Sequence, residues 1–273
     1  RRLGDVRLNS DKHGEWGKYI GGKSKITDDA YVSQTYNMAQ VGYDTLHGDW
    51  TVGGALLYGT SNSDYTLGSG SGKTAGLALY GAKQFNDGRY LDVIGKVSRL
   101  KNDFTVRNSL GTSLSGDYRN TGTSLSVEYG KRIKKDNGFY IDPNAELTLS
   151  RLSGVNFDAR TNTGSTVHIN SDAVNSVIGR IGVGIGKESK NSNLFLKAAL
   201  AHEFSGKVNT TYSAPGNPTV QTTVDLKDTW LDAEIGGSWS VRPSTYLYGT
   251  FTKNFGAIVE NTWRIDAGIR HNF

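Results

Sequence analysis

The chain has 273 residues and is rich in glycine and tyrosine, with 35 Gly and 14 Tyr against 1 Met and 4 Pro. It contains no cysteine, which excludes a disulfide framework, a thiolate metal site and a cysteine nucleophile. The net charge of +5 is spread along the chain without a basic block, so nucleic acid is not expected as a partner.

No stretch reaches the roughly 18 to 20 apolar residues that a membrane-spanning helix needs. The mean hydropathy of −0.47 still leaves a membrane protein possible. The strands of a transmembrane barrel are short and alternate lipid-facing with lumen-facing residues, so their average hydropathy is low. Helical spans are therefore excluded, whereas a barrel is not.

Residues 1–12 form a charged stretch that we expect to be the end of a linker leading into one barrel domain over residues 13–273. Within that domain, apolar residues return at every second position, which is the period of a strand with two different faces. Turn residues separate about twelve such runs. Their predicted centres are Gly17, Ala39, Leu56, Leu79, Gly95, Val127, Leu147, Val183, Ala198, Glu234, Tyr248 and Ala267.

Charged residues occupy the positions that alternate with the apolar ones. They include Asp92, Lys96, Glu128, Arg132, Glu146, Arg180, Lys197, Asp232 and Glu234. A soluble sheet rarely buries so many charges on one face. In a barrel within lipid the apolar face points outward and the charged face lines the lumen. We therefore predict an all-β fold, a transmembrane antiparallel β-barrel of about 12 strands with a charged lumen.

The turns between the predicted strands fall into two classes. Short turns with tight-hairpin signals such as Asp-Gly lie at residues 46–49, 86–88, 136–138, 191–193 and 242–244. Longer polar stretches, expected to be loops, lie at residues 22–29, 61–73, 102–118, 156–172 and 206–227. Short periplasmic turns at one rim and longer extracellular loops at the other are the outer-membrane arrangement.

The aromatic residues and histidines add two expectations. The five tryptophans lie near predicted strand ends, where the aromatic girdle of an outer-membrane barrel belongs. They are Trp16, Trp50, Trp230, Trp239 and Trp263. The five histidines are scattered without the spacing of a metal site, so neither a metal nor a cofactor is expected.

Several short motifs, in order along the chain, resemble one known family. They are RLGDVR at residues 2–7, GEWG at 14–17, YLDVIGK at 90–96, DPNAEL at 142–147 and RIDAGIRHNF at 264–273. Together they resemble the C-terminal β-barrel translocator domain of autotransporters, the type V secretion proteins, as carried by AIDA-like adhesins and serine-protease autotransporters. The resemblance covers essentially the whole chain.

The resemblance implies a function and a set of partners. An outer-membrane translocator anchors an N-terminal passenger, an adhesin or a protease that is not part of this sequence, and exports it to the bacterial surface. Its partners would be outer-membrane lipid and lipopolysaccharide, the periplasmic chaperones, the barrel-assembly machinery, and its own passenger with a linker helix in the lumen. The runner-up functions are a porin-like diffusion channel and an outer-membrane barrel enzyme.

The resemblance also assigns roles to particular residues. In the self-cleaving serine-protease branch, luminal acids help a linker asparagine attack its own peptide bond, and Asp92, Glu128 and Glu146 match those acids. The alternative is that they form a lumen charge network. Its further members would be Lys96, Arg132, Arg180, Lys197, Asp232 and Glu234. Whether the domain is an enzyme therefore stays open.

The last predicted strand carries one more expectation. Its apolar phase ends the chain on a lipid-facing strand, which predicts a recognition signal for barrel assembly. The residues concerned are Trp263, Ile265, Ile269 and Phe273.

Overall fold

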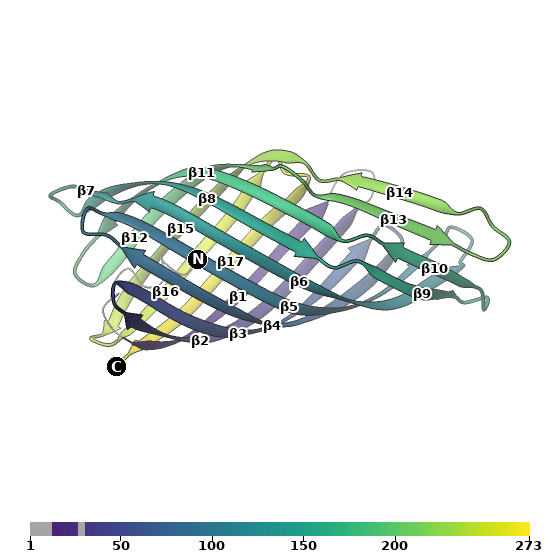
Figure 1. Ribbon diagram of the computed structural model, residues 1–273, viewed down its shortest axis with the longest axis horizontal. Helices are drawn as coiled ribbons and strands as arrows, with labels where there is room; N and C mark the ends of the chain where they lie inside the picture. The colour runs from purple at the N-terminus through teal and green to yellow at the C-terminus, as the bar shows by residue number, and fades with distance from the viewer. Residues whose placement is uncertain (1–12, 27–30) are drawn as a thin grey trace.

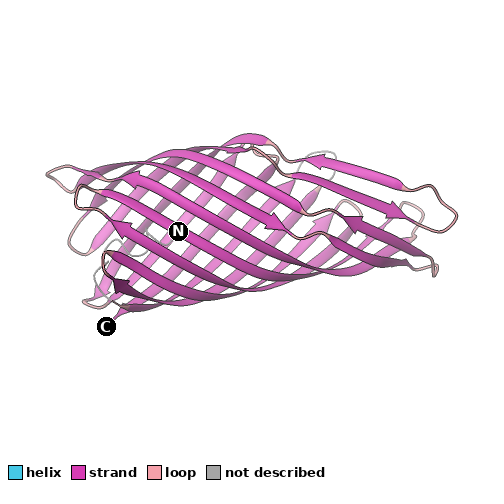
Figure 2. Cartoon of the chain, in the orientation of Figure 1, coloured by secondary structure: helices cyan, strands magenta, loops and turns pink. Residues whose placement is uncertain are grey.

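The computed structural model describes residues 13–26 and 31–273, and these form one closed barrel whose β-strands are tilted relative to its long axis (Figures 1 and 2). The expected linker at residues 1–12 lies outside the described residues. The strands are β1 (Gly14–Ile26), β2 (Val32–His47), β3 (Trp50–Tyr65), β4 (Gly68–Gln84), β5 (Arg89–Arg107), β6 (Ser113–Lys131), β7 (Ile133–Lys134), β8 (Phe139–Leu152), β9 (Val155–Thr161), β10 (Thr166–Ser171), β11 (Val174–Glu188), β12 (Ser192–Glu203), β13 (Lys207–Ser213), β14 (Val220–Asp225), β15 (Asp228–Arg242), β16 (Thr245–Phe255) and β17 (Val259–Asn272). Within this part of the chain there is no helix long and apolar enough to cross a membrane.

The strands form a barrel of twelve antiparallel strands, as predicted. The ring closes because β1 pairs with both β2 and β17. Every predicted strand centre falls inside a strand. Four of the predicted strands are interrupted, and their parts far from the C-terminal end of the barrel are separate strands. In this way β8, β11, β12 and β15 are extended by β9, β10, β13 and β14. The two-residue β7 is a short pairing within the turn between β6 and β8.

The outside of the barrel carries a continuous band of exposed apolar side chains, which we call the belt. Two of them show how open it is, since Leu79 is 73% exposed and Ile181 is 75% exposed. Exposure on this scale is unfavourable in water, by about 25 cal/mol for each Å² of apolar surface, and favourable in hydrocarbon. The belt includes Val41, Val52, Leu56, Leu79, Val97, Leu125, Leu147, Leu149, Ile181, Val183, Leu196, Leu200, Leu231, Ile235, Leu247, Ile265 and Ile269.

One end of the barrel carries the short turns, together with the C-terminus (Figure 1). The turns between β2 and β3, between β4 and β5 and between β6 and β8 each contain a glycine with positive φ, namely Gly48, Gly88 and Gly138. Only glycine adopts that backbone conformation without strain, which explains the tight-turn signals in the sequence.

The other end corrects the prediction of long loops. Most of residues 61–73 and 102–118 are paired strand, because β3 and β4 are joined after only residues 66–67, and β5 and β6 after residues 108–112. Residues 156–172 and 206–227 contain the hairpins β9–β10 and β13–β14. The longer excursions therefore exist, but they are mostly strands. Residues 27–30 of the first predicted loop lie outside the described residues.

These upper strands have inverted polarity, which is why their composition resembled that of loops. On β5, Leu91, Val93 and Val97 face outward in the belt. Farther from the C-terminal end of the barrel, the same outward phase holds Arg99 and Lys101. The inward phase changes in the opposite sense, from charged to apolar residues. We call this part the crown: residues 99–107 of β5, residues 113–121 of β6, and strands β9, β10, β13 and β14.

Candidate functional site: the charged lumen

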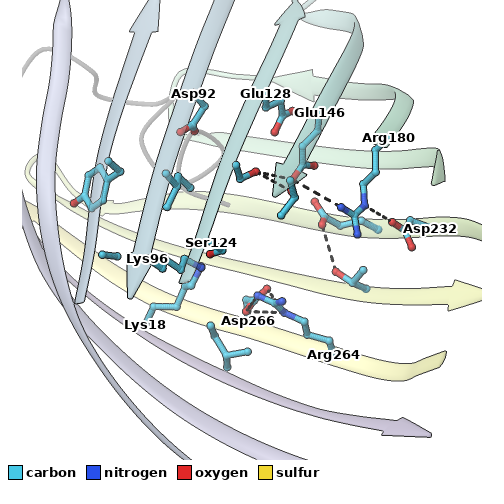
Figure 3. Close-up of a pocket in the computed structure, with 18 of the residues that line it drawn as sticks. Lys18, Asp92, Lys96, Ser124, Glu128, Glu146, Arg180, Asp232, Arg264 and Asp266 are labelled. Carbon is cyan, nitrogen blue, oxygen red and sulfur yellow. Dashed lines mark hydrogen bonds and ion pairs between the residues drawn. The ribbon is translucent and has the colours of Figure 1, made fainter. Parts of the chain in front are cut away.

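The lumen contains a cavity of about 340 Å³ that is lined by inward-pointing side chains from β1 round to β17 (Figure 3). Eight of the nine charged residues predicted for the lumen line it. They are Asp92, Lys96, Glu128, Glu146, Arg180, Lys197, Asp232 and Glu234. Their strand phase alone places them there, because alternate residues of a strand point to opposite faces.

Three acids form a row across neighbouring strands. Asp92 on β5 lies directly opposite Glu128 on β6, and Glu128 lies directly opposite Glu146 on β8. The row ends where Glu146 meets Arg180 on β11. Directly opposed side chains have Cβ atoms about 4.5–5.5 Å apart, and like charges in that position repel one another. All three carboxylates point into the lumen from one side of the barrel (Figure 3).

Cations and hydroxyl groups from neighbouring strands compensate this repulsion. Lys197 on β12 places its Nζ 3.2 Å from Glu128 Oε1. The Nη1 atom of Arg180 lies 4.0 Å from Glu146 Oε1, and its Nε donates to Asp232 Oδ2 at 2.9 Å. The hydroxyl of Ser126 donates to Glu146 Oε1 at 2.9 Å. The acid row is thus part of an ion-pair network.

A second group of charges lies away from the acid row. Lys18, Lys96, Arg264 and Asp266 gather at the lower part of Figure 3, with Arg264 Nη2 3.0 Å from Asp266 Oδ1. Lys96 forms no ion pair with any residue in the described part of the chain. Acids therefore outnumber cations on one side of the lumen, and cations outnumber acids on the other. Sequence alternation could assign each residue to the lumen, but not to a side of it.

Arg132, the ninth predicted lumen residue, lies elsewhere. It follows β6 at the turn end, with Nη2 3.3 Å from Asp142 Oδ2 and Nη1 3.3 Å from Glu188 Oε2. Its guanidinium lies over the ring of Tyr140, 3.7 Å from the centroid. Arg132 keeps the inward phase, because the pairing register of β6 with β8 continues through β7, but it lies nearer the turn end than the cavity does. Arg132 therefore belongs to the rim and not to the central cavity.

A buried network that the sequence did not reveal crosses the seam between the first and last strands. Arg270 on β17 forms a bidentate ion pair with Asp44 on β2, at 2.6 and 2.9 Å, and the Tyr80 hydroxyl donates to the same carboxylate at 2.9 Å. Arg270 reaches Asp44 over β1 at Gly14, where a Cβ atom would lie 2.6 Å from the guanidinium. Alternation marks both charged residues as inward, but nothing local in the sequence pairs residues 226 positions apart.

The tryptophans divide between the two faces, which corrects the girdle prediction for two of them. Trp16 lines the lumen and donates from Nε1 to the Tyr80 hydroxyl at 2.6 Å. Trp230 donates from Nε1 to Asp232 Oδ1 at 2.8 Å and lies under the Arg180 guanidinium. Both have polar partners available only inside the barrel. Trp50, Trp239 and Trp263 occupy the outward phase of their strands.

The residues of the expected assembly signal lie together on β17 and at the C-terminus. Ile265, Ile269 and Phe273 are each more than 40% exposed, and Trp263 shares their outward phase. The Phe273 ring lies edge-on against His271, with centroids 5.2 Å apart. The last strand thus presents an apolar face to the surroundings, and this face continues to the turn end of the barrel.

The closed barrel, its apolar belt and its charged lumen together define a class of protein. A closed barrel satisfies its backbone hydrogen bonds without free edges, and an apolar belt around a charged lumen suits it to lipid. The barrel is therefore a transmembrane protein of the outer-membrane type, with short turns on the periplasmic side and the crown on the extracellular side.

Comparison with known proteins gives the family. A model of the autotransporter beta-domain matches residues 16–252. The chain belongs to the autotransporter β-domain family and is the translocator domain of an autotransporter, and neither the porin-like channel nor the barrel enzyme is favoured. Domains of this family sit in the outer membrane and are linked to a passenger domain.

Three similar proteins place the chain within that family. The pertactin autotransporter of Bordetella parapertussis is 26% identical over 288 residues, covering 100% of this chain and 30% of that protein. Serine protease EspP of Escherichia coli O157:H7 is 27% identical over 285 residues, covering 100% of this chain and 21% of that protein. The translocator domain of the autotransporter NalP from Neisseria meningitidis has the same fold, with a TM-score of 0.80 at 16% identity, covering 100% of this chain and 94% of that one. The chain thus spans less than a third of these two full-length relatives.

Proposed function

We propose that this domain anchors a linked passenger in the outer membrane and carries it to the bacterial surface. The observation that supports the proposal is the closed barrel with a charged lumen, because a charged interior favours a hydrated polypeptide over lipid. The partners follow from the same setting: lipid and lipopolysaccharide around the belt, and periplasmic chaperones and the barrel-assembly machinery during insertion.

The test uses the full-length precursor in intact cells. Protease added outside should digest the passenger while the barrel keeps its heat-modifiable mobility in SDS, which reports a closed and folded barrel. A passenger that stays protected inside the cell, although the barrel is folded, would overturn the proposal.

The assembly signal is tested separately by deleting Phe273. Since Ile265, Ile269 and Phe273 present an exposed apolar face on the last strand, the deletion should lower the amount of folded barrel in the membrane. A matched variant, Phe255→Ala, removes an exposed aromatic residue at the opposite end of the neighbouring strand β16 and should have less effect. Normal assembly without Phe273 would contradict a role in recognition by the assembly machinery.

We also propose a second function, self-cleavage of the passenger linker inside the barrel, on the strength of the acid row. In this reaction the side-chain amide nitrogen of a linker asparagine attacks its own backbone carbonyl carbon. The C–N bond to the next residue breaks, a cyclic imide forms, and the leaving amine takes up the proton lost by the amide. Asp92, Glu128 and Glu146 would guide that proton, because closely spaced carboxylates can hold one between them.

The decisive variant is Asp92→Asn in the full-length precursor, followed by pulse-chase analysis of passenger release. It removes one ionisable group of the row with little change in size and should slow release while the barrel folds normally. Glu234→Gln is the control, because Glu234 lines the same cavity from β15, outside the row. Unchanged release in Asp92→Asn, or no cleavage within the barrel in the parent, would leave the row as a charge network only.

A further inference from the structure

The crown encloses an apolar interior at the extracellular end of the lumen. Its cavity has a volume of about 900 Å³. Three rings form its centre: Phe104 on β5, Tyr118 on β6 and Phe157 on β9, with centroids 6.1 Å apart for the two phenylalanines and 5.1 Å for Tyr118 and Phe157. Aliphatic side chains extend this lining, among them Leu100, Val106, Leu114, Ile169, Val174 and Val208.

This apolar interior cannot be explained by lipid, because the crown is polar outside. Arg99, Lys101, Asp117, Asp158 and Arg160 are exposed on its outer face. Hydrocarbon would not solvate such a surface. The crown therefore stands in water, with its apolar side chains turned inward as in a soluble β-structure.

The interior is also not packed as a core. Phe104, Tyr118 and Phe157 remain only partly buried, whereas the residues of a filled core would be almost fully buried. Ala159 and Ile169, next to them, are only 0% and 6% exposed and so show what closed packing looks like here. The crown thus contains apolar surface that an apolar ligand or side chain would cover.

The crown cavity is continuous with the lumen. Lys96 and Ser124 line both the charged cavity and the apolar one. Anything that leaves the lumen toward the surface therefore meets this interior next. Lipid around the barrel cannot enter the crown interior through the wall, because the strands of the wall are paired with their neighbours.

We propose that the crown interior binds the apolar side chains of an extended passenger segment as the passenger leaves the lumen. The inference rests on the proposed export function. A covalently linked segment is present at an effective concentration in the millimolar range, so even weak apolar contacts would be occupied. The crown would shelter apolar residues that have left the lumen but have not yet folded.

The test places the photo-crosslinking residue p-benzoylphenylalanine in the full-length precursor in cells, in place of Phe157. Crosslinked peptides identified by mass spectrometry should join this position to apolar segments of the passenger. The same residue in place of Phe251, which is 42% exposed on the belt, is the control and should give no passenger peptides.

A paired measurement separates binding from simple structural support. The variant Phe104→Ser/Phe157→Ser should slow the appearance of the passenger at the surface several-fold while the barrel stays heat-modifiable. The control Asp158→Ser/Arg160→Ser changes two outer-face residues on the same strand β9 and should leave the rate unchanged.

Two outcomes would overturn the inference. The first is the absence of passenger peptides at position 157 while export proceeds normally. The second is slowed export accompanied by loss of the heat-modifiable barrel, since the rings would then only hold the crown together. A parent precursor that never exposes its passenger would instead defeat the proposed export function, and the two failures are therefore distinguishable.

Discussion

In the belt, the outward phase of β5 holds Leu91, Val93 and Val97, whereas in the crown the same phase holds Arg99 and Lys101. The inward phase changes from charged to apolar at the same level. The backbone pattern is unchanged, because β5 pairs with β6 without a register shift throughout its length. What differs is the surrounding solvent. The comparison shows that polarity along one continuous strand records where the membrane ends.

The largest effect is expected where charge is buried inside the membrane-spanning part. Asp44 and Arg270 are 0% and 2% exposed. Asp44→Ala leaves the guanidinium buried without its carboxylate, and breaking a buried pair in this way costs about 3–5 kcal/mol. Denaturant titration in phospholipid vesicles measures the change in the free energy of unfolding.

The matched variant in the crown is Asp158→Ala. Asp158 pairs with His168 at 2.8 Å, but both side chains are about half exposed or more. Exposed ion pairs contribute about 0–1 kcal/mol, so the loss should be small. Equal losses for Asp44→Ala and Asp158→Ala would contradict the difference between the two regions.

The next effect tests the outer surfaces. Ile181→Arg places a cation on the lipid face of the belt and should destabilise the barrel by about 2–4 kcal/mol, the cost near the bilayer midplane. Asn156→Arg makes a comparable change on the outer face of the crown and should alter stability by no more than about 0.5 kcal/mol. The same vesicle titration applies. A large penalty at residue 156 would mean that lipid covers the crown.

A smaller effect is expected within the lumen. Lys197→Met removes the cation 3.2 Å from Glu128 and should cost about 1.5–3 kcal/mol, the range for a hydrogen bond to a charged group. Adding Glu128→Gln should restore most of the stability, since the neutral amide needs no cation. An additive loss in the double variant would show that the two side chains do not interact.

The belt and the lumen were predictable from sequence because lipid enforces a strict alternation. Each predicted strand centre lies in a strand, and eight of nine predicted charges line the lumen cavity. Arg132 has the predicted inward phase, but it lies beyond the cavity toward the turn end. The local period places residues on a face, but it does not give their position along the barrel axis.

The crown and the seam were not predictable in the same way. The crown strands are rich in Ser, Thr, Gly and charged residues, and composition alone makes such strands resemble loops. Trp16 and Trp230 lie inside because their indole N–H groups donate to Tyr80 and Asp232, and only the closed barrel provides these acceptors. The Asp44–Arg270 pair likewise depends on closure of the ring, because β1 must lie between its two strands.

The measurement that tests the polarity inversion most directly is single-cysteine spin labelling along β5, which the cysteine-free chain permits without background. Oxygen, which concentrates in lipid, should enhance the spin relaxation of labels at positions 91, 93 and 97. A water-soluble nickel complex should do so for labels at 99, 101 and 103. Labels at 100 and 104, inside the crown, should be shielded from lipid-borne oxygen. If the odd positions stay accessible to oxygen and inaccessible to nickel up to 103, the membrane covers the crown and the account of the two regions is wrong.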